Sequence, residues 1–530
     1  AEIASKELSI VLTARGRSGG DPIPLAGVPY HSAMTYISRL VNKGFTVAIC
    51  EQMEDPKLAK GLVKREVVRV MTPGTLSDPQ LLDENSNNWL VAFGQKAESF
   101  VLAAVEITTG EVQVTSGDRS EMHLLPEEFT RLRPREVLVL DSGEAMAGVS
   151  GQVPGEAPYD QLGAAIHARK LKEPEADGVL VTLYPQEHRA RFLTMPPLEL
   201  RVLGILADYL LDTQKCSLAH LRFPQPYRLG DGMVLDEATL RNLELMPDGR
   251  DKPIGGTLFE VLNQTKTSMG ARMLKRWLVR PLVQIASILV RQEQVAALVT
   301  DGIRLMDLRT LLERLPDFER LLSKIVLGGR SPRDLRALGM ALDRLPRLRE
   351  VLAGTPLAPL ADQLESPPGL AELLLKTLKD DLPPTLADGG FIADGIDPAL
   401  DELRSLQKDG DKWLVQFEER ERQTSGIKTL KVRKNSVFGY FIEISKAVSD
   451  KAPAHYVRKQ TLTTGERYIT AELKEYETKV FSAQDRSIAI EKQIFEQLIK
   501  EVHPHISCIQ TAGTALGTVD VLGSLAILAR

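Results

Sequence analysis

Cysteine, aromatic residues and long apolar runs are all scarce in this chain of 530 residues. The three cysteines, Cys50, Cys216 and Cys508, stand far apart, so neither a disulfide framework nor a cysteine-based metal site is expected. No run approaches the roughly 18 apolar residues of a membrane span, and the first residues lack the pattern of a secretory signal. These absences predict a soluble, cytoplasmic protein with no membrane contact.

A glycine-rich phosphate loop of the form G-x-x-x-x-G-K-[ST] is also missing from the sequence. That loop supplies the backbone cradle and the lysine that hold a nucleotide's phosphates. We therefore expect the chain as written not to hydrolyse ATP. We predict no catalytic residue, no bound cofactor and no metal in it.

The bulk composition is that of an ordinary globular protein. Apolar residues make up 43% and charged residues 26%, and the length allows three to five domains. The 66 basic side chains are outnumbered by 71 acidic ones, which gives a net charge of −5. Contact with a polyanion must therefore be local.

Two α/β blocks are predicted at the start, over residues 1–84 and 85–195. The first contains one helix, at 31–45, whose apolar spacing ends at Gly44, and a short helix tail precedes it at residues 1–7. A Gly- and Pro-rich surface loop is expected at 143–158. Period-two patterns or short apolar runs predict strands at 8–15, 46–52, 65–76, 88–95, 99–117 and 136–141.

Amphipathic helices separated by short turns fill residues 196–397. Pro281, Pro332 and Pro346 are expected near helix breaks. No repeat of fixed length is visible, so an irregular helical core is favoured over a solenoid.

Two long, charged, helix-patterned arms follow, one at 398–424 and the other within 471–530. Each arm is about 40 Å long at the rise of an α-helix. Because a β-patterned insert at 425–470 joins them, they must run antiparallel with the insert at their tip. Residues 426–467 hold nine Lys or Arg against three acids, a surplus of six positive charges.

A basic module on such arms predicts phosphate contacts to duplex DNA, which position a protein without reading sequence. Alternation places Lys428 and Lys431 on opposite faces of a strand, so we expect the charge to be spread along a ribbon whose cations meet at the tip. A solvated surface is the alternative. The predicted DNA-binding residues are Lys431, Arg433, Lys434, Arg458, Lys459 and Arg467, with Lys60, Lys64 and Arg65 as a subsidiary set.

Several strings resemble the MutS family of DNA mismatch-repair proteins. They are GIKTLKV, GYFIEIS, RKQTLTTGERY and ELKEYE in the insert, and LAGVPYHSAMTYISRLVNKGFTVAICEQMEDP, MVLDEATLRNLELM and LNQTKTSMGARMLKRWLVRPL before it. The resemblance implies a multidomain α/β plus α fold. The implied parts are a mismatch-recognition domain (1–84), an RNase H-like connector (85–195), a helical core (196–397), an ascending lever (398–424), a clamp (425–470) and a descending lever returning to the core (471–530).

The resemblance also implies partners for the intact family. These are mismatched duplex DNA, ATP with Mg²⁺ in an ATPase domain that would follow Arg530, a second copy of the chain and a MutL-type protein contacting the connector. It further implies a nucleoid-associated location in the cytoplasm. Dimerisation of this chain is doubtful, because the family's main dimer contact lies in the ATPase domain.

The family's mismatch wedge, a Phe-X-Glu motif, does not stand before Ala26 where it is expected. An inserted aromatic side chain of this kind unstacks a base step and kinks the duplex. Copies do occur at Phe417-Glu418-Glu419 and Phe441-Ile442-Glu443, outside the recognition domain. We therefore expect the chain to be truncated at both ends and to lack its mismatch reader.

Two alternatives from other classes remain. Glu106 within one predicted strand and Asp141 at the end of another are candidates for a magnesium pair of the nuclease type. The third possibility is a DNA-independent scaffold that uses the surfaces of the arms.

Overall fold

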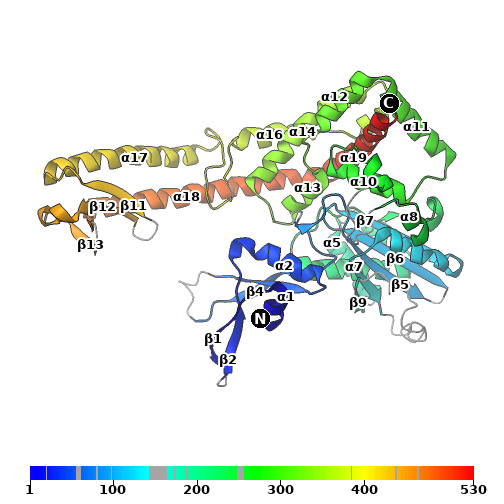
Figure 1. Cartoon of the computed structure of the whole chain (residues 1–530), viewed down its shortest axis with the longest axis horizontal. Coiled ribbons are helices and arrows are strands. Elements are labelled where there is room, and N and C mark those ends of the chain that lie inside the picture. The colour runs from blue at the N-terminus through cyan, green and yellow to red at the C-terminus, as the bar shows by residue number, and fades with distance from the viewer. Residues whose placement is uncertain are drawn as a thin grey trace. The chain divides into compact units, whose positions relative to one another are not determined.

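The computed structural model of the chain divides into two compact units, which are described separately (Figure 1). The first unit comprises Ala1–Arg330, Ala337–Ala371 and Val502–Arg530, and the second comprises Ser331–Arg336 and Glu372–Glu501. The structure describes all residues except 19–20, 55–60, 79–80, 97, 142–163, 172, 186–187, 247–255, 384, 436–438 and 462–464. The predicted loop at 143–158 and Lys60 lie outside the described residues.

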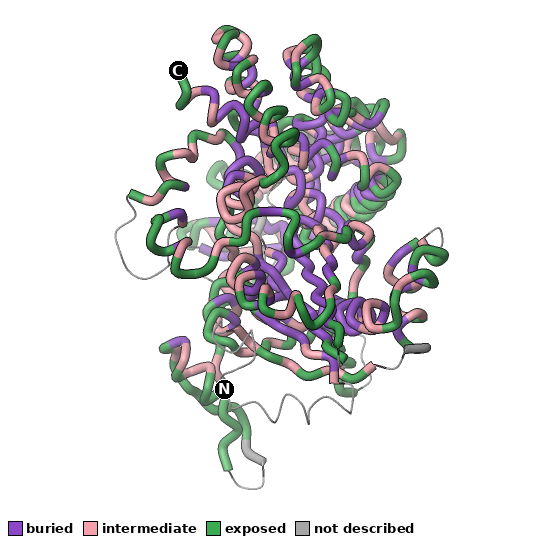
Figure 2. Tube along the Cα trace, turned by 90° about the vertical axis from the view of Figure 1, so that its right-hand side faces the viewer, coloured by how far each residue is buried: buried purple, intermediate pink, exposed green. Residues whose placement is uncertain are grey.

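The N-terminal segment is a small α/β arrangement, as predicted. Its helix α2 ends just before Gly44, whose φ of 85° suits a residue without a Cβ. The β1–β2 hairpin is exposed along its described length and appears green in Figure 2. The elements are α1 (Glu2–Leu8), β1 (Leu12–Ser18), β2 (Asp21–Ala26), η1 (Tyr30–Ser32), α2 (Ala33–Asn42), β3 (Val47–Gln52) and β4 (Arg65–Met71), with β1–β2 and β3–β4 as antiparallel pairs.

A six-stranded sheet in the order β10-β7-β6-β5-β8-β9 follows. β5, β6 and β7 form an antiparallel meander, β8 runs parallel to β5, and β9 runs parallel to β8. The predicted strands are confirmed, with a turn at Thr109-Gly110 that divides residues 99–117 into β6 and β7. The sequence did not predict β9 or β10. The strands are β5 (Trp89–Lys96), β6 (Ser99–Glu106), β7 (Glu111–Asp118), β8 (Glu136–Leu140), β9 (Ala165–Arg169) and β10 (Gln225–Pro226).

Helices cover both faces of this sheet, because its strands are apolar on both sides. Leu90 and Ala92 of β5 face one core, and Val91 and Phe93 face the other. The second core includes Phe129 of α3. The helices associated with the sheet are η3 (Arg119–Leu124), α3 (Leu125–Leu132), α5 (Glu173–Leu183), α6 (Arg189–Phe192) and α7 (Pro197–Gln214).

Helix α7 corrects one expectation. The sequence assigns it to the following helical core, but its buried residues Val202, Leu203 and Leu206 pack in the first sheet core with Leu90 and Ala103. Amphipathic spacing identifies a helix without saying which partner its apolar face will meet.

The remaining helices of the first unit surround α19, which is buried along most of its length. A Cβ added at Gly517 would lie 3.1 Å from the carbonyl oxygen of Met269, so this glycine permits close packing of α19 against α10. The helical elements of this part are η5 (Leu229–Asp231), α8 (Glu237–Asn242), α9 (Leu258–Leu262), α10 (Ser268–Val279), α11 (Ile285–Thr300), α12 (Gly302–Leu312), α13 (Phe318–Val326), α15 (Ala358–Ala361), η7 (His503–His505) and α19 (Ile506–Leu528). Helix α14 (Pro332–Leu352) belongs to the first unit from Ala337 on, and most of α16 (Leu370–Thr377) belongs to the second unit.

Pro346 does not break its helix, contrary to the prediction. It lies inside α14, and the fully buried Leu342, Leu345 and Leu348 surround it. Burial of this leucine stripe outweighs the one backbone hydrogen bond that proline cannot donate.

The second unit contains the two predicted arm helices, α17 (Pro398–Ser425) and α18 (Ala471–Val502). They run antiparallel, side by side (Figure 1). Arg404 donates to Glu491 at 2.6 Å, and the Trp413 and Tyr476 rings stack at 4.2 Å. The helical stretch 471–528 is long and apolar enough to cross a membrane, but 67% of its apolar window is buried, as in a core helix.

A buried carboxylate, Glu136 at the start of β8, connects three parts of the first unit. It accepts from the Thr72 hydroxyl at 2.5 Å, from the Gly74 N–H at 2.8 Å and from the Tyr209 hydroxyl of α7. His167 Nε2 of β9 lies 3.1 Å away. Burial alone would raise the pKa of Glu136, but these partners hold it below its usual value.

Replacing Glu136 by Ala should lower the free energy of unfolding by about 2–4 kcal/mol, because three donors would lose their acceptor in a buried site. Urea denaturation followed by circular dichroism measures this loss. Glu98→Ala is the matched control, since Glu98 is an exposed acid paired with Arg119 at the surface, and it should cost under about 0.5 kcal/mol. Equal effects of the two substitutions would contradict the role of Glu136.

The stability that His167 contributes should depend on pH. The contact with Glu136 raises the pKa of His167 above its usual value of 6.5. Its contribution is therefore complete below about pH 6.5 and is lost as the pH rises through the folded-state pKa. The difference in melting temperature between the natural chain and His167→Asn should be larger at about pH 6 than at about pH 8.5. A difference that grows with pH would contradict this assignment.

Candidate nucleic-acid interface

Strands β11 (Lys431–Asn435), β12 (Gly439–Ser445), β13 (Val457–Thr461) and β14 (Gly465–Ile469) form one antiparallel sheet in the order β11-β12-β14-β13. The short helix η6 (Lys446–Lys451) follows β12. Helix α17 ends at Gly426, whose φ is 67°, and Leu430 then donates to Ile427 in a turn. The strand therefore begins at Lys431, so the expectation that Lys428 lies in the strand is wrong.

The inner face of this sheet is apolar and packs on the two arm helices. Tyr440, Ile442 and Ile444 of β12 join Phe417 of α17 and Leu473 of α18 in one buried cluster. Gly439 is needed where β12 begins, because a Cβ there would lie on the Glu477 carboxylate of α18. The apolar inner face fixes which side of the sheet is left for solvent.

Hydrogen bonds also join the sheet to α17. The Glu418 carboxylate accepts the Val432 N–H at 2.7 Å, and the Tyr456 hydroxyl donates to Glu421 at 2.7 Å. Burial, together with that acceptor, raises the pKa of Tyr456. The sheet is therefore held by polar as well as apolar contacts, which fixes the direction of its outer face.

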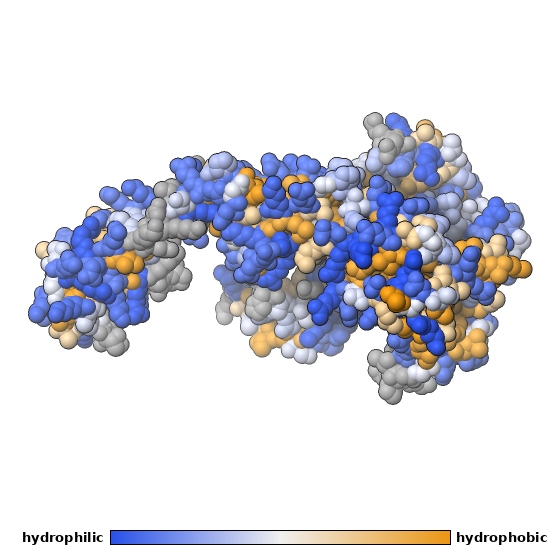
Figure 3. All heavy atoms as spheres, turned by 90° about the horizontal axis from the view of Figure 1, so that it is seen from above, coloured by the Kyte–Doolittle hydropathy of each residue, from blue (hydrophilic) through white to orange (hydrophobic). Residues whose placement is uncertain are grey.

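The outer face carries a row of charges. The strand register places Lys431, Glu443 and Arg467 side by side on neighbouring strands, with Arg433 opposite Phe441. Arg433 Nε lies 4.0 Å and Arg467 Nε 3.9 Å from the Glu443 carboxylate. We call the row of Lys431, Arg433 and Arg467 the outer cluster. The visible surface of this module, at the left of Figure 3, is mostly hydrophilic.

The three cations of the outer cluster differ in side-chain exposure and in the number of contacts they make. Lys431 is exposed and has no ion-pair partner among the described residues. The Arg433 side chain is 54% exposed, whereas that of Arg467 is 18% exposed. Arg467 lies over the Phe441 ring at 4.4 Å and donates to Gln460 at 2.8 Å. Lys431 and Arg433 are therefore the most available to a phosphate.

The other predicted cations of the insert do not all join this row. Arg458 pairs in register with Tyr468, on the inner-facing side, and its Nη1 lies 3.3 Å from Glu466. Lys459 is exposed in the bulge that interrupts β13. The expectation that all these cations meet is thus correct for Lys431, Arg433 and Arg467 and wrong for Arg458. The side chain of Lys434 lies outside the described residues.

The subsidiary set lies in the N-terminal segment of the first unit. Lys64 and Arg65 are exposed where β4 begins. Lys64 Nζ lies 2.7 Å from Glu66, and this pairing raises the pKa of Lys64. Glu66 therefore partly neutralises the charge of Lys64.

Neither copy of Phe-X-Glu presents an aromatic wedge. Phe417 is 2% exposed and Phe441 is 4% exposed, the first inside the sheet core and the second beneath Arg467. A side chain that enters a base stack must be free to leave its own surroundings.

The proposed magnesium pair is wrong. Glu106 lies opposite Trp89, where β5 begins, whereas Asp141 follows the end of β8, which runs parallel to β5. The two carboxylates are therefore separated by about 20 Å along the strands. Glu106 accepts from Thr108 at 2.6 Å, and Asp141 lies 3.2 Å from Lys170. No group of three potential metal ligands occurs in the described part of the chain.

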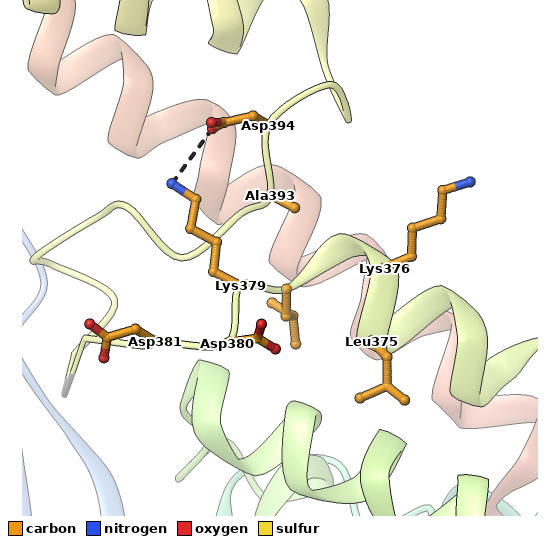
Figure 4. A pocket seen from close by; sticks show the side chains of 8 residues that line it. Leu375, Lys376, Lys379, Asp380, Asp381, Ala393 and Asp394 are labelled. Carbon is orange, nitrogen blue, oxygen red and sulfur yellow. Dashed lines mark ion pairs between the residues drawn. The ribbon is translucent and has the colours of Figure 1, made fainter.

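A shallow pocket of about 500 Å³ in the second unit is also charged, and several of its charged side chains pair with one another or with neighbouring residues (Figure 4). Lys379 Nζ lies 3.6 Å from Asp394, which also accepts from Arg404 at 2.8 Å. Asp380 pairs with Arg336. Lys379, Asp380 and Asp394 are therefore already paired within the protein.

Sequence reasoning missed three residues of the interface. Phe441 and Gln460 support Arg467, and Glu443 lies between the two arginines. Alternation in GYFIEI was a usable signal, because it places Phe441 and Glu443 opposite the apolar Tyr440, Ile442 and Ile444. The position of Gln460 depends on the bulge and had no such signal.

Comparison with known proteins identifies the family. The chain matches the profile of MutS domain III over residues 238–526 and that of MutS domain I over residues 1–80. It is 41% identical over 540 residues to the DNA mismatch repair protein MutS of Symbiobacterium thermophilum, 40% over 544 to that of Solibacter usitatus and 37% over 552 to that of Methanosarcina barkeri. These alignments include 99–100% of this chain and 61% of each relative, so the chain spans about three fifths of their length. Since the domain III profile alone covers more than half of the chain, the chain belongs to the MutS family of DNA mismatch-repair proteins.

Proposed function

We propose that this chain binds the backbone of duplex DNA through the outer cluster, as the clamp of a MutS-like mismatch-repair protein. The observation that carries the proposal is the row of Lys431, Arg433 and Arg467 on the one face of the sheet that the arm helices leave open. Clustered cations bind phosphates and release their counterions. Contacts to phosphate position a protein without reading sequence, so we expect little sequence preference.

We further propose the family's finer domain roles for this fold. The N-terminal α/β segment would be the recognition domain, and the six-stranded sheet the connector. Its antiparallel meander followed by two parallel strands supports an RNase H-like assignment. Helices α17 and α18 would be the levers, an assignment supported by their antiparallel pairing and by the sheet packed against both.

For the intact protein we propose the family's remaining properties. These are ATP and Mg²⁺ bound by an ATPase domain, assembly with a second copy, contact with a MutL-type partner and a cytoplasmic, nucleoid-associated location. The chain as given contains no phosphate loop, so we propose that it does not hydrolyse ATP on its own. The nuclease alternative loses its basis, since Glu106 and Asp141 are apart.

Binding should be nearly independent of mismatches, because the chain as given lacks the Phe-X-Glu wedge before Ala26 and buries both later copies. Fluorescence titration of a homoduplex and of a duplex with one G·T mismatch, of equal length, compares the two. We expect the two dissociation constants to agree within about tenfold, or 1.4 kcal/mol. A larger preference for the mismatch would show that another residue reads it.

Replacing both Lys431 and Arg433 by Ala should weaken binding to every duplex alike. It should also reduce the slope of log K against log salt by up to about 1.8, if each cation contacts one phosphate. Arg458→Ala is the matched control, because this arginine occupies the same sheet but faces the other way. An unchanged slope in a correctly folded double variant would refute the proposed interface.

A further inference from the structure

The outer face carries one acidic side chain on its described strands, Glu443, and this acid lies in the middle of the basic row. Its carboxylate lies between two guanidinium groups, 4.0 Å from Arg433 Nε and 3.9 Å from Arg467 Nε. An acid at that point lowers the positive potential where it is otherwise greatest. Solubility does not require such a placement, because the chain already carries an excess of acids elsewhere.

The two arginines meet Glu443 in different ways. Arg467 is fixed by three contacts, with the Phe441 ring beneath it, Gln460 at one end and Glu443 beside it. Arg433 has Glu443 as its only ion-pair partner among the described residues and remains 54% exposed. Glu443 is thus one of three contacts that orient Arg467, whereas Arg433 can exchange partners more easily.

Both contacts with Glu443 are long for ion pairs and the acid is partly exposed to water, so they are weak. A phosphate that approaches the face can offer an arginine shorter and bidentate hydrogen bonds. Exchange of Glu443 for phosphate is therefore favourable for the arginine. It leaves the Glu443 carboxylate close to the phosphate, which opposes binding.

We propose that Glu443 is a positioning residue that competes with DNA phosphate for Arg433 and Arg467. It orients Arg467 in the free protein and limits how tightly the face holds a duplex. This inference rests on the proposed function, because it assumes that the outer cluster meets phosphate. A contact weakened in this way is released readily as the duplex moves past.

The test is Glu443→Gln, which keeps the shape of the side chain and removes its charge. Binding to a homoduplex should tighten by roughly three- to tenfold at low salt. The slope of log K against log salt should steepen by up to about 0.9, equivalent to one more phosphate contact. Glu443→Asp keeps the charge and should bind nearly as the natural chain does. Asp450→Asn makes the same charge change at an exposed site in η6 and should leave the slope unchanged.

Circular dichroism confirms that each variant is folded before binding is measured. If Glu443→Gln binds as the natural chain does, or more weakly, while the Lys431 and Arg433 substitutions still weaken binding, the competition is refuted and the proposed function stands. If neither change alters the salt slope, the outer cluster is not the interface and both proposals fail. Equal tightening by Glu443→Gln and Asp450→Asn would show a general charge effect and would also refute the role of Glu443.

Discussion

The parts of the first unit are held together by buried charged groups and their hydrogen-bond partners. The Glu136 carboxylate is the clearest case. A buried carboxylate is costly unless donors surround it, so folding must bring the donors to it. Here they come from the turn after β4 and from α7, and His167 of β9 lies 3.1 Å away as an ion-pair partner. One side chain at the start of β8 thereby sets where the N-terminal segment and α7 meet the sheet.

The same device recurs among the helices. Asp520 of α19 accepts from the Lys266 N–H at 2.9 Å and the Thr267 N–H at 2.7 Å, where α10 begins. Arg272 of α10, which is 1% exposed, donates to Asp317 at 2.5 Å and to Glu319 at 2.8 Å. Apolar packing alone tolerates sliding between helices, whereas these paired charges specify one arrangement of partners.

The two faces of the sheet in the second unit have different roles. Its inner face supplies the packing, and its outer face carries charges that contribute little to folding. Substitution on the outer face can therefore change binding while the sheet stays intact. Because sequence alternation alone does not say which face packs on the arms, the sequence showed only part of the proposed interface.

What could be predicted follows from local patterns. Apolar spacing located α2, α17 and α18, and alternation located β5 to β8. Three features depended on distant contacts and could not be foreseen. The partner of α7 is a sheet far back in the chain, Pro346 is held by surrounding leucines, and the bulge at Lys459 reverses which neighbours face outward. Charge counting found the cations of the insert but not the acid that lies among them.

The position of α19 has a consequence for synthesis. This helix fills the middle of the first unit, and Asp520 reaches donors that lie 254 positions earlier. Helices α10 to α13 pack on α19, so their apolar faces stay exposed to solvent until residues 506–528 have been synthesised. The second unit, encoded between them, can fold during that interval, since α17, the sheet and α18 contact one another over shorter separations. The nascent chain can thus complete the second unit before the first, and chaperone binding is expected to concentrate on α10–α13.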